Sequence, residues 1–345
     1  MHYYLSNLLA FFSAPLLSTF LASALLLLSS NASSASIEYD LDKVLRNQSF
    51  HFATSDKIYC APAKKTHSSD YPHSDYMLDV ASAKNLVVFV HGFVPTRRGG
   101  HEGLDEMASD WKYHIDILDD LKADTSYCVV TWDTEYGFDD SNKTLSKFLT
   151  AYDFAARDPR LDSSTKNITM VGHSAGGNYI KYSYLSFLDE QPNIQKLTGK
   201  IQPKNLKTRI ITLSTPHLGS TVADTAQMTS YLASLAASLI FGQQGANSIS
   251  VLPHKANSRG AGQLKSIHLN DALYNLNRRF AKNFPKKRIY AFGSPGDSNV
   301  TYYSSAPSFT TPVKFKNMSH SEFFRPYLVN GYSDILLAIY SGKGY

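Results

Sequence analysis

The chain has 345 residues, of which 43% are hydrophobic and 12% aromatic, which is enough to bury a full core in one domain. Its formal net charge is +5, from 34 basic and 29 acidic residues. The longest basic cluster is residues 285–288, so no nucleic-acid partner is indicated. The charge balance predicts a solvated surface, with contact to an anionic membrane surface as the alternative.

Residues 8–28 form an uncharged apolar stretch, which is followed by small residues up to Ala35. Ser33, Ser34 and Ala35 resemble a signal-peptidase site, so residues 1–35 are predicted to be a cleaved export signal. Cleavage would leave residues 36–345 as a secreted or periplasmic domain. The stretch is also long enough to span a bilayer, so an uncleaved N-terminal membrane anchor is the alternative.

Cys60 and Cys128 are the only two cysteines. In an oxidising compartment they could pair, and closing a loop of this size would stabilise the fold by roughly 4 kcal/mol in the chain-entropy model. Cys128 also lies in an apolar strand at about 127–132, where a small buried thiol packs well without a partner. The sequence leaves both possibilities open.

Residues 86–90 are five consecutive apolar residues, and His91, Gly92 and Phe93 follow them. Such a run predicts a central parallel strand that is buried on both faces and ends in a turn. The alternative role for His91 is a core histidine with satisfied hydrogen bonds.

Residues 172–176 read GHSAG, after an apolar strand predicted at 168–172 and before a helical stretch at 175–189. Glycines on both sides of Ser174 allow a sharp turn and close backbone packing. A strand, a strained turn and a helix in this order favour an exposed nucleophilic hydroxyl on Ser174.

The next apolar strand is predicted at 208–213 and continues into LSTPHLGS at 213–220. About seventy residues then precede the following strand, and we expect them to form a helical lid insertion at about 221–285. Within it, Leu232, Leu235, Leu239 and Ile240 have helical spacing and form one apolar stripe. The stripe predicts either packing on the core or a cover over an acyl pocket.

A strand at 287–293 runs into a Gly/Pro turn, and Asp297 follows it. Asp297 is the candidate for the carboxylate that orients a catalytic imidazole. It could also be an ordinary turn residue, and Asp224 is the alternative acid.

His320 follows a predicted strand at 312–316 and is the only histidine after Asp297. It is therefore the candidate general base, and the chain order is Ser174, Asp297, His320. His217 lies before any lid and close after Ser174, so we expect it to support the site structurally.

Together these segments resemble the α/β-hydrolase superfamily, in its lipase and GPI inositol-deacylase-like branch. The resemblance rests on VVFVHGF (87–93), VGHSAGG (171–177), LSTPHLGS (213–220), GSPGDSNV (293–300) and His320, and covers the chain from about residue 80. It implies a carboxylic-ester hydrolase that needs no cofactor or metal. It also implies an oxyanion hole made by the backbone amides of Phe93 and Ala175.

The predicted fold is a doubly wound, mostly parallel α/β sheet with a helical lid insertion. A further strand is expected at 49–55, and helices at 104–123, 144–157, 264–284 and 332–341. The predicted function is hydrolysis of lipid or small acyl esters. The alternatives are a membrane-tethered lipid deacylase or acyltransferase, and a non-catalytic hydrolase-like binding protein.

Overall fold

The computed structural model describes residues 57–63, 73–93, 110–118, 124–132, 144–156, 165–198, 206–220 and 262–342, with single positions 121, 134, 137, 138, 158, 161, 223 and 224. The predicted export segment, the expected strand at 49–55 and the apolar stripe at 232–240 lie outside these residues. No helix in the described ranges is both long enough and apolar enough to cross a membrane.

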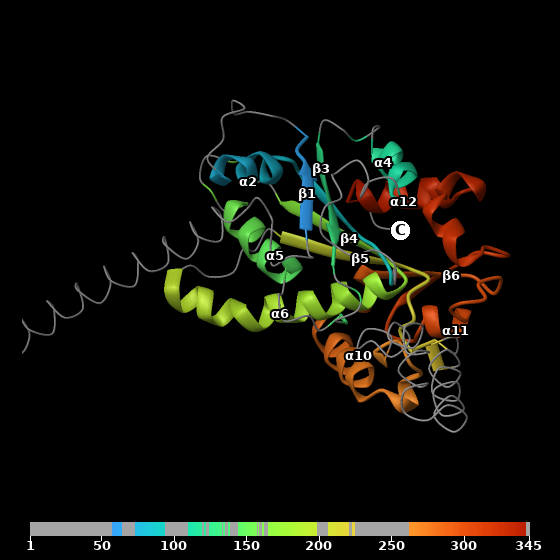
Figure 1. The fold of residues 1–345 in the computed structure, drawn as a ribbon. Coiled ribbons are helices and arrows are strands. Elements are labelled where there is room, and N and C mark those ends of the chain that lie inside the picture. Colours follow the sequence, from blue (N-terminus) through green and yellow to red (C-terminus); the bar gives the residue numbers. More distant parts are fainter. Residues whose placement is uncertain are drawn as a thin grey trace, which may run out of the picture.

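A seven-stranded sheet in the order β1-β3-β2-β4-β5-β6-β7 forms the centre of the molecule (Figure 1). All neighbouring strands are parallel except the edge pair β1 and β3. This confirms the predicted doubly wound, mostly parallel sheet. The strands are β1 (Lys57–Ala61), β2 (Asn85–Val90), β3 (Thr125–Thr131), β4 (Lys166–His173), β5 (Leu206–Leu213), β6 (Ile289–Gly293) and β7 (Thr311–Lys314).

Helices cover both faces of the sheet, and the side chains of β2 show why. Val88 and Val90 pack into one apolar cluster, whereas Val87 and Phe89 pack into a second cluster on the opposite face. The helices are α2 (His73–Ser82), α4 (Lys112–Leu118), α5 (Thr144–Ala155), α6 (Ala175–Thr198), α10 (Asp271–Asn283), α11 (Tyr302–Ser305) and α12 (Tyr332–Tyr340). Figure 1 shows α2, α5 and α6 on one side and α4 and α12 on the other.

The described part of the expected lid region contains α10, an amphipathic helix. Its residues Leu273, Leu276 and Phe280 are buried and join the same apolar cluster as residues of α6. The side chain of Asn270 accepts a hydrogen bond from the Leu273 amide and caps the first turn. This helix therefore packs on the main core, while residues 225–261 of the expected insertion lie outside the described ranges.

Cys60 and Cys128 are joined in a disulfide. They lie directly opposite each other in the antiparallel register of β1 and β3. The bond therefore fastens the edge strand to the rest of the sheet, and it settles the question that the sequence left open.

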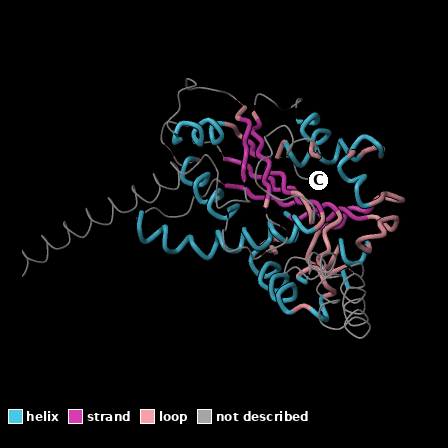
Figure 2. The backbone as a smooth tube through the Cα atoms, in the orientation of Figure 1, coloured by secondary structure: helices cyan, strands magenta, loops and turns pink. Residues whose placement is uncertain are grey.

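The parallel strands β2, β4, β5, β6 and β7 all end at the same edge of the sheet (Figure 2). The loops that follow these strands are therefore brought together, although they come from distant parts of the chain. The described residues also contain four 3-10 turns, η2 (Ile267–Leu269), η3 (Lys286–Arg288), η4 (His320–Phe324) and η5 (Pro326–Leu328). The turn η3 directly precedes β6 and lies at the opposite edge of the sheet.

Candidate active site

Ser174 lies in the sharp turn between the end of β4 and the start of α6. Its φ angle is +51°, in the left-handed region that a non-glycine residue adopts at a cost of about 1 kcal/mol or more. The Ser174 amide donates a hydrogen bond of 2.8 Å to the carbonyl oxygen of Leu213 on β5. A Cβ atom at Gly176 would lie 2.4 Å from the carbonyl oxygen of His91, so only glycine fits there. The strand, turn and helix expected around Ser174 are present.

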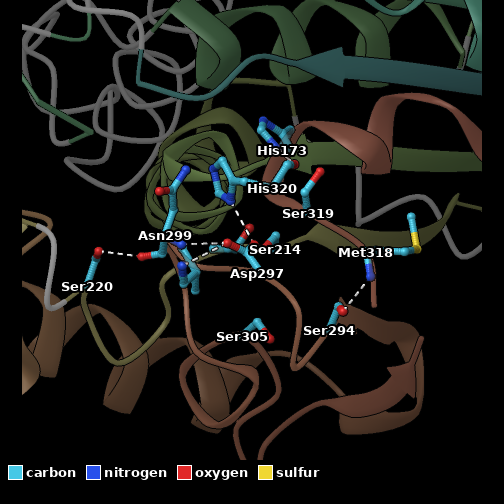
Figure 3. A network of polar contacts seen from close by, with 12 residues as sticks. His173, Ser214, Ser220, Ser294, Asp297, Asn299, Ser305, Met318, Ser319 and His320 are labelled. Carbon is cyan, nitrogen blue, oxygen red and sulfur yellow. Dashed lines mark hydrogen bonds and ion pairs between the residues drawn. The ribbon is translucent and has the colours of Figure 1, made fainter. Parts of the chain in front are cut away.

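Asp297 follows β6 and is almost completely buried. Its Oδ1 accepts hydrogen bonds from the amides of Asn299, at 2.8 Å, and Val300, at 3.0 Å. Its Oδ2 accepts from Nδ1 of His320, at 2.8 Å, and from the hydroxyl of Ser214 (Figure 3). Burial opposes ionisation of this carboxyl, but the hydrogen bonds outweigh it and hold the pKa of Asp297 below its usual value.

His320 is the first residue of η4, and a capping box fixes the turn that carries it. The Ser319 side chain accepts from the Glu322 amide, and the Glu322 carboxylate accepts from the Ser319 amide. The His320 side chain is 19% exposed, so solvent or substrate can reach it. Since Nδ1 donates to Asp297, the imidazole keeps Nε2 as its proton-accepting atom.

The ring of His173 packs beside that of His320, with their centroids 4.6 Å apart. His173 immediately precedes Ser174 in the chain, and Figure 3 shows its ring next to His320 and on the same side of the Asp297 loop. The contact therefore brings the end of β4, where Ser174 begins the turn, to the His320–Asp297 pair.

The loop after β2 passes directly beside Ser174. A Cβ atom at Gly92 would lie only 2.7 Å from Cβ of Ser174. Nδ1 of His91 lies 2.6 Å from the Gly92 carbonyl oxygen and thereby fixes the peptide that carries the Phe93 amide. Ala175 is buried at the first position of α6. The predicted oxyanion donors are the amides of Phe93 and Ala175, which directly follow Gly92 and Ser174. Gly92 and Ser174 lie against each other at this point.

His217 is fully buried inside the fold. Its Nδ1 lies 2.9 Å from Nζ of Lys181, and its Nε2 lies 3.0 Å from Oγ1 of Thr212. Burial, and then the nearby Lys181, lower the pKa of His217 well below its usual value. With both ring nitrogens engaged in the interior, His217 is suited to a structural role.

Asp224, the alternative acid, has different partners. Its carboxylate accepts hydrogen bonds from the amide of Ser266, at 3.0 Å, and from the Ser266 hydroxyl. It therefore ties two segments of the expected insertion to each other, while Asp297 is the carboxylate that contacts His320.

Sequence reasoning missed two residues that contact the His320–Asp297 pair, namely His173 and Ser214. His173 occupies the variable position of the GHSAG motif, and Ser214 lies in LSTPHLGS, where His217 is the residue type more often found in catalysis. One available signal was position, because Ser214 directly follows a strand that we expected to end at the same edge as Ser174. Among the described residues, no group of three or more His, Cys, Asp or Glu side chains is arranged to hold a metal ion.

Comparison with known families matches residues 81–309 to a family described as "Putative serine esterase (DUF676)". The match includes Ser174 and Asp297 and ends before His320. No curated protein matches this chain in sequence.

Several solved structures are similar to this chain at low identity. The mature lipase BlEst2 of Bacillus licheniformis is 18% identical, with a TM-score of 0.46, over 81% of this chain and 98% of that one. Est1E from Butyrivibrio proteoclasticus is 14% identical, with a TM-score of 0.40, over 82% and 92%. An α/β hydrolase superfamily protein from Enterococcus faecalis is 12% identical, with a TM-score of 0.41, over 83% and 95%.

Proposed function

This chain belongs to the family described as "Putative serine esterase (DUF676)", and on that premise we propose that it hydrolyses carboxylic esters through an acyl-enzyme on Ser174. The observation that carries the proposal is the 2.8 Å hydrogen bond between Nδ1 of His320 and Oδ2 of Asp297. This pair lies against the end of β4, where Ser174 occupies its left-handed turn.

In the proposed reaction, Oγ of Ser174 attacks the ester carbonyl and gives its proton to Nε2 of His320. Asp297 holds the imidazole in the tautomer that accepts this proton and stabilises the imidazolium that forms. The amides of Phe93 and Ala175 stabilise the negative oxygen of the tetrahedral intermediate. Losing one such donor typically costs about 2.7–4 kcal/mol of transition-state stabilisation.

Collapse of the intermediate breaks the bond to the alcohol, which leaves with the proton from His320. Water then attacks the acyl-enzyme, again with His320 as general base, and releases the acid and the free Ser174 hydroxyl. The buried position of Asp297 supports this role, because its negative charge is screened little by solvent.

We further propose acyl esters of lipids or of small alcohols as the substrates. A panel of nitrophenyl esters of rising acyl length, assayed beside a phospholipid, measures this preference. Turnover that rises with acyl length supports an apolar acyl pocket, while equal rates on monomeric and micellar esters would count against a lid that opens at interfaces.

The disulfide between Cys60 and Cys128 supports the proposal that the protein acts in an oxidising compartment, after export directed by residues 1–35. Sequencing the N-terminus of the mature protein tests this proposal. A terminus near Ser36 supports a cleaved signal, and a retained segment at 8–28 supports the membrane-anchored alternative.

Replacing Ser174 with alanine tests the proposed function, with thermal unfolding as the control for folding. We expect turnover of nitrophenyl esters to be lost while the unfolding transition stays cooperative. Wild-type protein that turns over none of the esters would favour a non-catalytic binding protein, and full activity in the Ser174→Ala variant would refute the role of Ser174.

A further inference from the structure

Ser174 and Ser214 are both non-glycine residues with positive φ, and they end neighbouring strands. Their φ angles are +51° and +47°, and the residues before them, His173 and Leu213, are direct partners in the register of β4 and β5. Left-handed conformations at non-glycine residues persist only where the surrounding structure holds them, and they cluster at functional sites. The sharp turn between β4 and α6 explains the left-handed conformation of Ser174. The left-handed conformation of Ser214 also requires an explanation.

Leu213 and Ser214, at the left-handed turn after β5, make three hydrogen bonds to neighbouring segments. The Leu213 carbonyl oxygen accepts the Ser174 amide, at 2.8 Å, and the Ser214 amide donates to the carbonyl oxygen of Phe292 on β6, at 2.8 Å. The Ser214 hydroxyl then points at Asp297 and donates to its Oδ2 (Figure 3). Two consecutive residues thus contact both the serine and the acid of the site.

Burial makes the contact to Asp297 consequential. Ser214 is 0% exposed, so its hydroxyl is shielded from bulk water. Oδ2 of Asp297 is the same atom that accepts Nδ1–H of His320, so the Ser214 hydroxyl bonds to the oxygen that orients the imidazole. Hydrogen bonds to charged groups in such surroundings are about twice as strong as those between neutral groups.

We propose that Ser214 is a positioning residue, whose hydroxyl holds Oδ2 of Asp297 in the orientation that aligns His320 for proton transfer. This inference rests on the proposed ester hydrolysis. Ser214 acts only through Asp297 and does not touch the substrate, so removing its hydroxyl lowers kcat and leaves KM unchanged.

Two substitutions at Ser214 distinguish the effect of losing the hydroxyl from the effect of relieving the backbone strain. Ser214→Ala removes the hydroxyl and keeps a side chain in the left-handed conformation, whereas Ser214→Gly removes the hydroxyl and also relieves the strain. We expect both variants to lose kcat by the same factor of about tenfold or more. The glycine variant should nevertheless unfold at a higher temperature than the alanine variant, so stability and activity move separately.

Ser305 supplies the matched control. It is also a fully buried serine near the site, but its hydroxyl donates to the carbonyl oxygen of Tyr302 in its own turn. Figure 3 shows it away from the Asp297 carboxylate. Ser305→Ala removes a buried hydroxyl from the same region and should keep the wild-type kcat.

A double-mutant cycle tests whether Ser214 acts through Asp297. The initial rate with an activated nitrophenyl ester is measured for wild type, Ser214→Ala, Asp297→Ala and the double variant. We expect Ser214→Ala to slow the wild type about tenfold or more and to have almost no further effect once Asp297 is absent. A hydroxyl that only stabilises the fold would slow both backgrounds by the same factor.

The outcomes of this experiment separate the two proposals. Equal kcat in wild type, Ser214→Ala and Ser214→Gly overturns the role of Ser214 and leaves the proposed ester hydrolysis intact, as does an equal loss in both backgrounds of the cycle. Absence of turnover in wild type, or full turnover in Ser174→Ala, overturns the proposed function and the role of Ser214 with it.

Discussion

Nε2 of His173 lies 2.9 Å from the carbonyl oxygen of His320, and the two rings pack with centroids 4.6 Å apart. A carbonyl oxygen can only accept, so Nε2 of His173 carries the proton and donates it. Burial, and then the neighbouring His320, lower the pKa of His173 to about 3, which keeps its ring neutral at neutral pH. The residue before the proposed nucleophile therefore supports the backbone of the proposed base.

Replacing His173 with phenylalanine should keep the ring packing and remove the donor to His320. We expect kcat to fall about fivefold, because one hydrogen bond contributes about 1 kcal/mol, while KM changes little. His173→Gln restores an amide donor and should recover part of the loss. Steady-state kinetics on one nitrophenyl ester measures all three proteins, and a wild-type kcat in His173→Phe would show that the contact does not position His320.

Replacing Gly92 with alanine should distort the site by steric overlap. An alanine there would place its Cβ 2.7 Å from Cβ of Ser174 and 3.1 Å from the carbonyl oxygen of His173, so the loop or the serine must move. A displacement of about 1 Å at a catalytic group can lower the rate about 100-fold, and we expect a loss of this order in kcat/KM.

Gly331→Ala is the control for Gly92→Ala. Gly331 has a φ of +80° but no heavy atom within 4 Å of an added Cβ, so the substitution strains the backbone without touching the site. It should lower the free energy of unfolding by about 1 kcal/mol and leave kcat/KM unchanged. Wild-type kcat/KM in Gly92→Ala would mean that the close approach to Ser174 is not needed.

Burial of His114 should make the free energy of unfolding depend on pH. It is buried, with Nε2 donating to the Phe323 carbonyl oxygen at 2.8 Å and Nδ1 lying 2.9 Å from the Tyr340 hydroxyl. Burial lowers its pKa to about 4, against 6.5 in an unfolded chain. Below pH 6.5 the unfolded state therefore binds the proton first, and the stability that is present above pH 6.5 is lost as the pH falls toward 4.

Urea unfolding at pH 7 and pH 5 measures this effect by comparison with His114→Gln. The wild type should lose about 2 kcal/mol more free energy of unfolding between these pH values than the variant does, because the variant has no proton to take up at this position. Other buried groups affect both proteins equally and cancel in the difference. The same pH dependence in both proteins would contradict the assignment to His114.

The Cys60–Cys128 disulfide, which closes a sequence separation of 68 residues, should stabilise the fold by about 4 kcal/mol in the chain-entropy model. Urea unfolding of the Cys60→Ala/Cys128→Ala double variant, with wild type under oxidising conditions beside it, measures the difference. The bond lies at the β1 edge of the sheet, so kcat should be unchanged. Identical unfolding midpoints would show that the bond does not constrain the unfolded chain.

The sequence was sufficient to predict the central strands and the turn at Ser174, because apolar runs and flanking glycines encode them locally. The edge strand β1 was not predicted, because its five residues carry no clear alternation and lie next to the segment that was expected to form a strand. The pairing of Cys60 with Cys128 depends on strand register, which the residues of either strand do not determine alone.

The contacts around Asp297 also depend on the folded sheet and could not be predicted from local sequence. Its place after a strand made it a candidate, but its partner Ser214 is 83 residues earlier in the chain. Only the folded sheet, which places β5 beside β6, brings these side chains together. The left-handed conformation of Ser214 is likewise imposed by tertiary contacts, since serine has no intrinsic preference for it.

Covalent labelling of the wild-type protein with a fluorophosphonate, followed by mass spectrometry of its peptides, identifies the nucleophile of the enzyme. We expect one stoichiometric label on Ser174, and no label in the Ser174→Ala variant. An active wild-type enzyme that carries the label on another residue, or that stays unlabelled, would contradict the assignment of Ser174 as the nucleophile.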